Sequence, residues 1–388
     1  MNTNELIEAE DKYFINTFAR QPIVLDHGKG VKVWDKDGNE YIDMFAGIAV
    51  NALGHAHPKL VNALQGQVEK LIHVSNIYYN EPAIEYAKKL LPLTEFDRLF
   101  YANSGAEANE GAIKLALKYT GKSEIITAKD SFHGRTLLTL AATGHEEYRG
   151  PYLKNLPQGF IEVPYNDIEA IKEAISDETA AIMLEPIQGE GGVNVPSKKY
   201  FDEIAEICAE KDILLILDEV QTGFGRCGTL FAHELFDIKA DIMTIAKGVG
   251  GGVPMGAFLA TEKVAGGFVP GDHGTTFGGG PLVCAAANAV LDTILDEDLL
   301  ENSKKVGAYF KDKLNELKEK HDKIVDVRGH GLMIGVELSE SGAGYVDKLR
   351  EMGFLINCTA GNVLRFVPPL IITNEEIDEF VEALDKAL

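Results

Sequence analysis

Residues 214–223 read LLILDEVQTG, and residues 241–248 read DIMTIAKG. Each stretch is a short apolar run closed by a charged residue, Asp218 in the first and Lys247 in the second. Runs of this length predict buried strands of a parallel sheet. Because ligands of open α/β sheets bind at the carboxyl ends of the strands, we expect the Asp218 carboxylate and the Lys247 amine to face one crevice.

An amine and a carboxylate in one crevice are what pyridoxal phosphate requires. A lysine amine can hold the cofactor aldehyde as a Schiff base, while a carboxylate pairs with the protonated pyridine nitrogen and keeps the ring able to accept electrons. Taken alone, Lys247 could equally be a solvated lysine of a loop, and Asp218 could equally be a cap at the end of a strand. The pair together, with the motifs described below, favours a cofactor site.

The middle of the chain alternates strands with helices and predicts one large α/β domain. The strands we expect there are 98–102, 124–127, 180–184, 213–217, 241–246 and 257–260. This order predicts a mostly parallel sheet that is covered on both faces. We expect the large domain to span residues 46–285.

The two ends of the chain predict a smaller α+β domain. Alternating runs at 31–35 and 40–43 flank Asp37-Gly38-Asn39 and read as a hairpin. A charged helical region begins near Asp292, and it precedes three short strands and a closing helix, at 324–327, 335–338, 363–367 and from Asn374. The hairpin could add to these strands, so we expect residues 1–45 and 286–388 to form this domain together.

Two junctions between strands and loops offer further ligand contacts. In YANSGAEANE at 101–110 a helix begins after a strand, with Ser104 and Glu107 in capping-box spacing. Such a helix start can bind a phosphate, which Gly105 and Ala106 would leave room to approach, although most helix starts bind nothing.

The second junction is KDSFHGR at 129–135. Phe132 could stack on a pyridine ring, and Arg135 could bind a carboxylate with two N–H groups. A core phenylalanine and a surface arginine would give the same pattern.

The composition is that of an ordinary soluble protein, with 388 residues, 45% of them hydrophobic. The net charge of −23 disfavours nucleic acid and anionic membranes as partners. There is no apolar run near the roughly 18 residues of a membrane span and no signal-peptide pattern, so we expect a cytoplasmic protein. The four cysteines, Cys208, Cys227, Cys284 and Cys358, lack the spacing of a zinc site or a disulfide framework, so we expect no metal.

Three motifs resemble, in order, the signature of the class III (ornithine-type) aminotransferases: DEVQTGFGR at 218–226, AKG at 246–248 and HGTTFGG at 273–279. The resemblance covers nearly the whole chain. Three more segments are most similar to the acetylornithine-type branch, which serves arginine biosynthesis: NSGAEANE at 103–110, SFHGRT at 131–136 and EPIQGEGG at 185–192. The resemblance implies a fold-type-I transferase that binds pyridoxal phosphate, with a seven-stranded, mostly parallel sheet, and a homodimer whose subunits share the active site.

The resemblance also implies cofactor contacts. Lys247 would hold the cofactor and move the proton, and Asp218 would pair with the pyridine nitrogen. Gln221 would donate to the phenolic oxygen. Phe132 and Val220 would enclose the ring, and Thr276 would reach the phosphate from the other subunit. The full set of implied cofactor residues is Ser104, Gly105, Ala106, Phe132, Asp218, Glu219, Val220, Gln221, Lys247 and Thr276.

For the substrates, the resemblance implies N2-acetylornithine and the pair 2-oxoglutarate and glutamate. Arg135 would bind the carboxylate farther from the reacting carbon, and Arg365 the α-carboxylate of glutamate. Glu190 would pair with Arg365 while the ω-amine substrate is bound. Thr275 of the neighbouring subunit would contact the substrate. Phe18 would pack against its chain, and it replaces a tyrosine of ornithine aminotransferases, which disfavours unacylated ornithine.

Other activities use the same core residues. Ornithine, succinylornithine, N-succinyldiaminopimelate and 4-aminobutyrate aminotransferases therefore stay open as alternatives. A glutamate-semialdehyde aminomutase fits less well, because a mutase does not need the second carboxylate clamp of Arg365 and Glu190. A non-catalytic regulator would need a DNA-binding module for which the chain has no spare segment, and a crystallin-like role would not require Lys247 and Asp218.

Overall fold

The apolar runs of the large sheet place successive side chains on opposite faces, as a strand must. In the computed structural model, which describes residues 1–388, Leu214 and Ile216 belong to one hydrophobic core, whereas Leu215 and Leu217 belong to a second. Helix α5 (Gly105–Thr120) contributes to the first core, and α9 (Lys198–Lys211) and α11 (Pro281–Asp296) contribute to the second. Both faces of the sheet are therefore covered, as predicted.

The large sheet has seven strands in the spatial order β4-β10-β9-β8-β7-β5-β6. Their bounds are β4 Arg98–Ala102, β5 Glu124–Ala128, β6 Phe160–Val163, β7 Thr179–Leu184, β8 Leu214–Asp218, β9 Ile242–Ile245 and β10 Gly256–Ala260. Only β10 runs antiparallel to its neighbours, so the other six strands end at the same edge. The prediction of a seven-stranded, mostly parallel sheet is confirmed.

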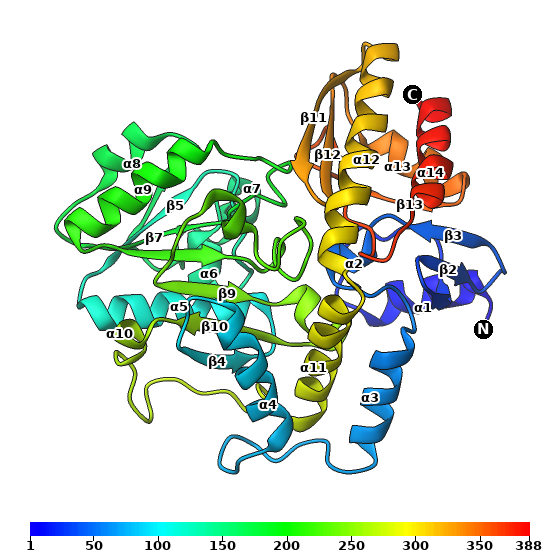
Figure 1. Cartoon of the computed structure of the whole chain (residues 1–388). Helices are drawn as coiled ribbons and strands as arrows, with labels where there is room; N and C mark the ends of the chain where they lie inside the picture. Colours follow the sequence, from blue (N-terminus) through cyan, green and yellow to red (C-terminus); the bar gives the residue numbers. More distant parts are fainter.

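Two smaller sheets come from the ends of the chain. The first has the order β1-β2-β3-β13, with bounds Leu25–Lys29, Lys32–Asp35, Glu40–Asp43 and Phe354–Leu355. The second has the order β11-β12-β15-β14, with bounds Ile324–His330, Met333–Leu338, Val363–Phe366 and Asn357–Thr359. In Figure 1 the blue N-terminal strands lie beside the orange and red C-terminal segments.

The predicted hairpin is confirmed as the antiparallel pair β2 and β3. It pairs with β13 through β3, in parallel, instead of joining the sheet of β11, β12 and β15. The domain boundaries at residues 46 and 285 stay a prediction.

Fourteen α-helices and four short 3-10 helices complete the fold. The helices not bounded above are α1 Thr3–Tyr13, α2 Ala46–Ala49, α3 Pro58–Val68, α4 Glu81–Leu90, α6 Leu137–Ala142, α7 Glu146–Arg149, α8 Ile168–Ala174, α10 Glu262–Ala265, α12 Leu299–Lys320, α13 Ala343–Glu351, α14 Asn374–Ala387, η1 Leu91–Leu93, η2 Gly150–Tyr152, η3 Ala232–Phe236 and η4 Lys247–Gly250. Helices α11 and α12 follow each other across the junction between the large sheet and the two smaller ones (Figure 1). None of the helices has the length and apolar character needed to cross a membrane.

A buried histidine braces the turn that follows β8. The Glu219 carboxylate accepts the backbone N–H groups of Ala232 and His233, at 3.0 and 2.7 Å. The His233 Nδ1 atom lies 3.0 Å from Glu219, and its Nε2 atom lies 3.3 Å from Glu95. Burial alone would lower the pKa of His233, but the two carboxylates raise it to about 10. A protonated ring between two carboxylates therefore fixes the segment next to Asp218.

Replacing His233 by Gln should remove a pH-dependent part of the stability. Because the folded pKa is raised from 6.5 to about 10, this contribution is complete below pH 6.5 and is lost as the pH rises through 10. Urea unfolding should give wild type a larger free energy of unfolding than His233→Gln at pH 6.5, and a smaller advantage at pH 10. An advantage that stays constant between these two values would contradict a protonated His233.

Candidate active site

A cavity of about 400 Å³ lies where the loops after β4, β5, β7, β8 and β9 meet. Its lining includes Asn103 to Ala106, Asn109, Phe132 to Arg135, Glu185, Ile187, Glu190, Asp218, Val220 to Thr222, Ala246 and Lys247. Strands β8 and β9 are adjacent and parallel, which brings the side chains at their ends to one place. Asp218 and Lys247 therefore face the same cavity.

Asp218 is held by three hydrogen-bond donors. Its Oδ2 atom accepts from Asn109 Nδ2 at 2.8 Å and from His133 Nδ1 at 2.7 Å, and its Oδ1 atom accepts from the Val220 N–H at 3.0 Å. The residue is only 3% exposed. An ionised carboxylate can only accept hydrogen bonds, so an environment made entirely of donors suits the charged form.

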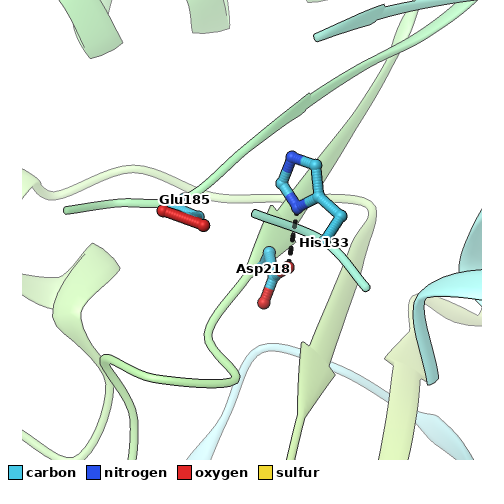
Figure 2. Close-up of side chains that lie close together, drawn as sticks. All are labelled: His133, Glu185 and Asp218. Atoms are coloured by element: carbon cyan, nitrogen blue, oxygen red, sulfur yellow. Dashed lines mark hydrogen bonds and ion pairs between the residues drawn. The ribbon is translucent and has the colours of Figure 1, made fainter. Parts of the chain in front are cut away.

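His133, Glu185 and Asp218 form a buried cluster (Figure 2). Their nitrogen and oxygen atoms lie within 4.8 Å of one another, a spacing that a metal ion could use. The His133 Nδ1 atom donates to Asp218, and the Glu185 carboxylate accepts the N–H groups of Phe132 and Gly189 at 3.0 and 3.1 Å, whereas the His133 Nε2 atom is buried without a partner. We therefore interpret the cluster as a hydrogen-bonded support for Asp218.

The charges within this cluster influence one another. Burial alone would lower the pKa of His133, but the hydrogen bond to Asp218 and the charges of both carboxylates raise it above its usual value. Burial raises the pKa of Glu185 to about 7, although the charge of His133 acts in the opposite direction. The hydrogen bond to Asp218 and the two carboxylates therefore favour the protonated form of His133.

Lys247 follows β9 and begins η4. Its backbone has a φ of 46°, a left-handed value that is uncommon outside glycine and that often marks functional positions. Burial lowers the pKa of the Lys247 amine, and the Glu190 carboxylate opposes this effect. A desolvated amine with a lowered pKa is a suitable nucleophile toward an aldehyde.

The start of α5 faces the cavity and can bind an anion. Ser104 caps the helix by accepting the Glu107 N–H at 3.2 Å. A capping box would also need the Glu107 carboxylate to accept the Ser104 N–H, and this part of the prediction is wrong. The Glu107 carboxylate instead accepts the backbone N–H and the side-chain amide of Asn103. The first N–H groups of a helix have no partner inside it, so those of Gly105 and Ala106 are free for a phosphate.

Arg365 is fully buried and forms an ion pair beside the cavity. Its Nη1 atom donates to Glu190 Oε1 at 2.7 Å and to Gln221 Oε1 at 2.9 Å. Gln221 Nε2 in turn donates to Glu190 at 3.1 Å. Burial alone would raise the pKa of Glu190, but Arg365, Lys247 and Gln221 lower it to about 2. Glu190 is thus a charged acid that lines the cavity and compensates Arg365.

Arg135 is the second arginine of the site. Its guanidinium carbon lies 3.5 Å from the centre of the Tyr148 ring and 5.4 Å from that of Phe132. Arg135 lines the cavity and is exposed, so a carboxylate can reach it.

Four residues from the sequence analysis lie away from this chain's own cavity. Glu219 is buried and contacts His233, Thr222 and backbone groups. Phe18 is 69% exposed. Thr275 accepts a hydrogen bond from Asn103 Nδ2 at 3.0 Å, and Thr276 is exposed.

Sequence reasoning missed four residues at or behind the site. Asn109, His133 and Glu185 stand inside the motifs quoted above, but nothing in their spacing shows that they meet at Asp218. Helical periodicity could have found Asn109, which lies four positions after Gly105 on the same face of α5. Tyr148 carried no signal in the sequence.

Comparisons with known proteins give relatives over nearly the whole chain. Residues 15–388 match the protein family described as "Aminotransferase class-III". The acetylornithine aminotransferase of Methanothermobacter thermautotrophicus is 57% identical over 384 residues, which are 99% of this chain and 98% of that protein.

Two solved structures have the same fold over nearly their whole length. The acetylornithine aminotransferase of Elizabethkingia anophelis has a TM-score of 0.89 and 37% identity, and the match covers 100% of this chain and 99% of that one. An ornithine aminotransferase of Toxoplasma gondii, described with partial occupancy of PLP at its active site, has a TM-score of 0.95 and 34% identity, with 99% and 94% covered.

Replacing Asp218 by Asn should destabilise the cofactor-free protein. The new amide N–H₂ group cannot accept, so at least one buried donor among Asn109, His133 and the Val220 N–H loses its partner. We expect the free energy of unfolding in urea to fall by about 1–3 kcal/mol. The exposed residue Asp237, changed to Asn, serves as the matched control and should leave stability unchanged. Equal stability of Asp218→Asn and wild type would rule out this donor arrangement.

Proposed function

Because the chain belongs to the class III aminotransferases, we propose that it transfers the terminal amino group of N2-acetylornithine to 2-oxoglutarate. The products are N-acetylglutamate 5-semialdehyde and glutamate, a step of arginine biosynthesis. The observation that carries the proposal is the pair of arginines at the cavity: Arg135 lies against an aromatic ring, and Arg365 is paired with the carboxylate of Glu190. The names of the relatives narrow the substrate to acetylornithine.

The residues of the cavity fit pyridoxal phosphate, the cofactor of this family. When bound, the cofactor supplies an aldehyde that takes up an amine and a ring that accepts the electrons released at the reacting carbon. Lys247 is the amine for the aldehyde, and Asp218 is the carboxylate for the pyridine nitrogen. The N–H groups of Gly105 and Ala106, with the Ser104 side chain nearby, would hold the phosphate.

The remaining cavity residues orient the ring. Phe132 and Val220 line the cavity and would lie against its two faces, and the Gln221 amide would donate to its phenolic oxygen. Asn109 and His133 hold the Asp218 carboxylate in place by direct hydrogen bonds. Glu219 would act from behind, because its contacts fix the turn that carries Val220 and Gln221.

Lys247 moves the proton. With cofactor and substrate bound, the free Lys247 Nζ would take the proton from the carbon that bears the amine, and it would give the proton back to that carbon in the reverse reaction. Its lowered pKa, caused by burial, favours the neutral form that this step needs. An ionised Asp218 would keep the pyridine nitrogen of the cofactor protonated, and this would sustain the electron demand of the ring.

Two substrates of different shape share the site through the two arginines. Arg135 would bind the carboxylate farther from the reacting carbon, which is the α-carboxylate of acetylornithine or the γ-carboxylate of glutamate. Arg365 would bind the α-carboxylate of glutamate after Glu190 has moved away. With acetylornithine, which has no carboxylate next to the reacting amine, Glu190 would stay paired with Arg365.

We also propose a homodimer that shares its active sites. Thr275 and Thr276 would then reach the substrate and the phosphate of the neighbouring subunit, and Phe18 would pack against the substrate chain. Large apolar side chains that are exposed on the single chain support this assembly: Ile77, Tyr78, Tyr79 and Phe277. A cytoplasmic location agrees with the four free cysteines, three of which are buried.

The substrate assignment predicts a clear preference in a kinetic panel. Glutamate formation from 2-oxoglutarate should proceed with a kcat/KM for acetylornithine at least about tenfold above that for ornithine, succinylornithine or 4-aminobutyrate. Lys247→Ala lacks the reactive amine and should show no turnover with any of them. A higher kcat/KM for ornithine or 4-aminobutyrate would reject acetylornithine as the substrate, while leaving the aminotransferase class intact.

The Glu190 switch predicts opposite effects on the two half-reactions. Glu190→Ala leaves the buried Arg365 without its acid, a loss that typically costs on the order of 3 kcal/mol or more. Acetylornithine should therefore react more slowly, while glutamate should react as fast or faster. Arg365→Ala should impair glutamate strongly and acetylornithine weakly. Single-turnover spectra separate the two halves, and equal slowing of both by Glu190→Ala would refute the switch.

A further inference from the structure

The two arginines of the site have different kinds of partner. The Arg365 guanidinium is compensated by an acid, Glu190, at 2.7 Å. The Arg135 guanidinium instead lies over two aromatic rings, with Tyr148 at 3.5 Å and Phe132 at 5.4 Å. This difference stands out in a chain with 60 acidic residues and 37 basic ones, in which a carboxylate would be the common partner of an arginine.

Tyr148 is held firmly in this position. Its neighbour Arg149 forms an ion pair with Glu162 of β6 at 2.6 Å, which anchors helix α7 to the edge of the large sheet. The Phe132 ring meets Tyr148 edge-on, with centroids 6.2 Å apart, and the His145 ring lies 5.2 Å away. The Arg135 guanidinium lies over the face of the Tyr148 ring.

An aromatic ring can hold a guanidinium without competing for its ligand. A cation is attracted to the face of the ring, and this contact occupies the flat side of the guanidinium. The N–H groups at its edge stay free to bind a carboxylate with two hydrogen bonds. An acid in the place of Tyr148 would occupy those N–H groups, and the substrate would have to displace it.

We propose that Tyr148 is a positioning residue that determines specificity for a distal carboxylate. Its ring holds Arg135 in a fixed orientation and leaves its hydrogen-bonding edge open in both half-reactions. Arg135 thus needs no switch, whereas Arg365 does. This proposal rests on the role of Arg135 in the proposed function, and Tyr148 does not line the cavity, so it acts through Arg135 without touching the substrate.

The test compares substrates with and without the distal carboxylate that Arg135 would bind. Acetylornithine and glutamate carry it, and N-acetyl-1,4-diaminobutane is acetylornithine without it. In single-turnover measurements on the holoenzyme, Tyr148→Leu and Tyr148→Met should lower kcat/KM for acetylornithine and glutamate about tenfold, mainly by raising KM. The same variants should leave the carboxylate-free amine within about twofold of wild type. Tyr148→Phe keeps the ring and should leave all three substrates within about twofold.

Two results would overturn the proposal. An equal loss for all three substrates would give Tyr148 a merely structural role, and an equal loss in Tyr148→Phe and Tyr148→Leu would assign the effect to the hydroxyl group. Thermal unfolding and the absorbance of the bound cofactor identify any variant that fails to fold. If Tyr148→Leu fails to fold, Tyr148→Met is used in its place. Glutamate separates a failure of the proposed function from a failure of this inference. If the wild-type enzyme reacts with glutamate but not with acetylornithine, the proposed function is refuted. If Tyr148→Leu keeps the wild-type kcat/KM for glutamate, this inference is refuted.

Discussion

A buried carboxylate surrounded by donors is the constraint on which the rest of the site depends. Asp218 is almost fully buried, and a charge in that position is tolerated only when hydrogen bonds replace its lost hydration. The donors come from helix α5, from the loop after β5 and from the turn after β8. Three segments must therefore take their places before a charged Asp218 can be buried, so the site is complete only when the large sheet and its covering helices have assembled.

The same principle governs the cationic groups, each of which has a different kind of neighbour. Arg365 is paired with the Glu190 carboxylate, and Arg135 lies against aromatic rings. Lys247 is desolvated by burial, which lowers its pKa. The backbone around Glu190 is fixed, because Gln188 and Asn194 exchange two backbone hydrogen bonds and the Thr359 hydroxyl donates to the Glu190 carbonyl oxygen. The proposed switch thus requires only a rotation of the Glu190 side chain, with the loop left in place.

Local patterns in the sequence were sufficient for most strands of the large sheet and insufficient for several of the others. Strands β4, β5, β7, β8, β9 and β10 lie where the apolar runs predicted them. The sequence pattern did not reveal β1, β6, β13 and β14: β1 and β14 are mostly polar, β13 has only two residues, and β6 has four. Their pairing partners decide whether they form, and β13 is more than 300 positions away from its partner β3 in the sequence.

The sequence by itself determined which chemistry the protein carries. A lysine and an aspartate close predicted strands, Arg135 stands in a family motif and Arg365 lies within a predicted strand, and the strand pattern already places Lys247 and Asp218 at one edge. Only the tertiary structure decided what surrounds them. His133 and Asp218 are 85 positions apart, and Arg365 and Glu190 are 175 apart, yet each pair lies within 2.7 Å. Such contacts arise from the packing of separate loops on the sheet, and local sequence patterns report only on neighbours along the chain. The chain's chemistry can thus be read from its motifs, whereas the charge state and orientation of each group follow from contacts that exist only after folding.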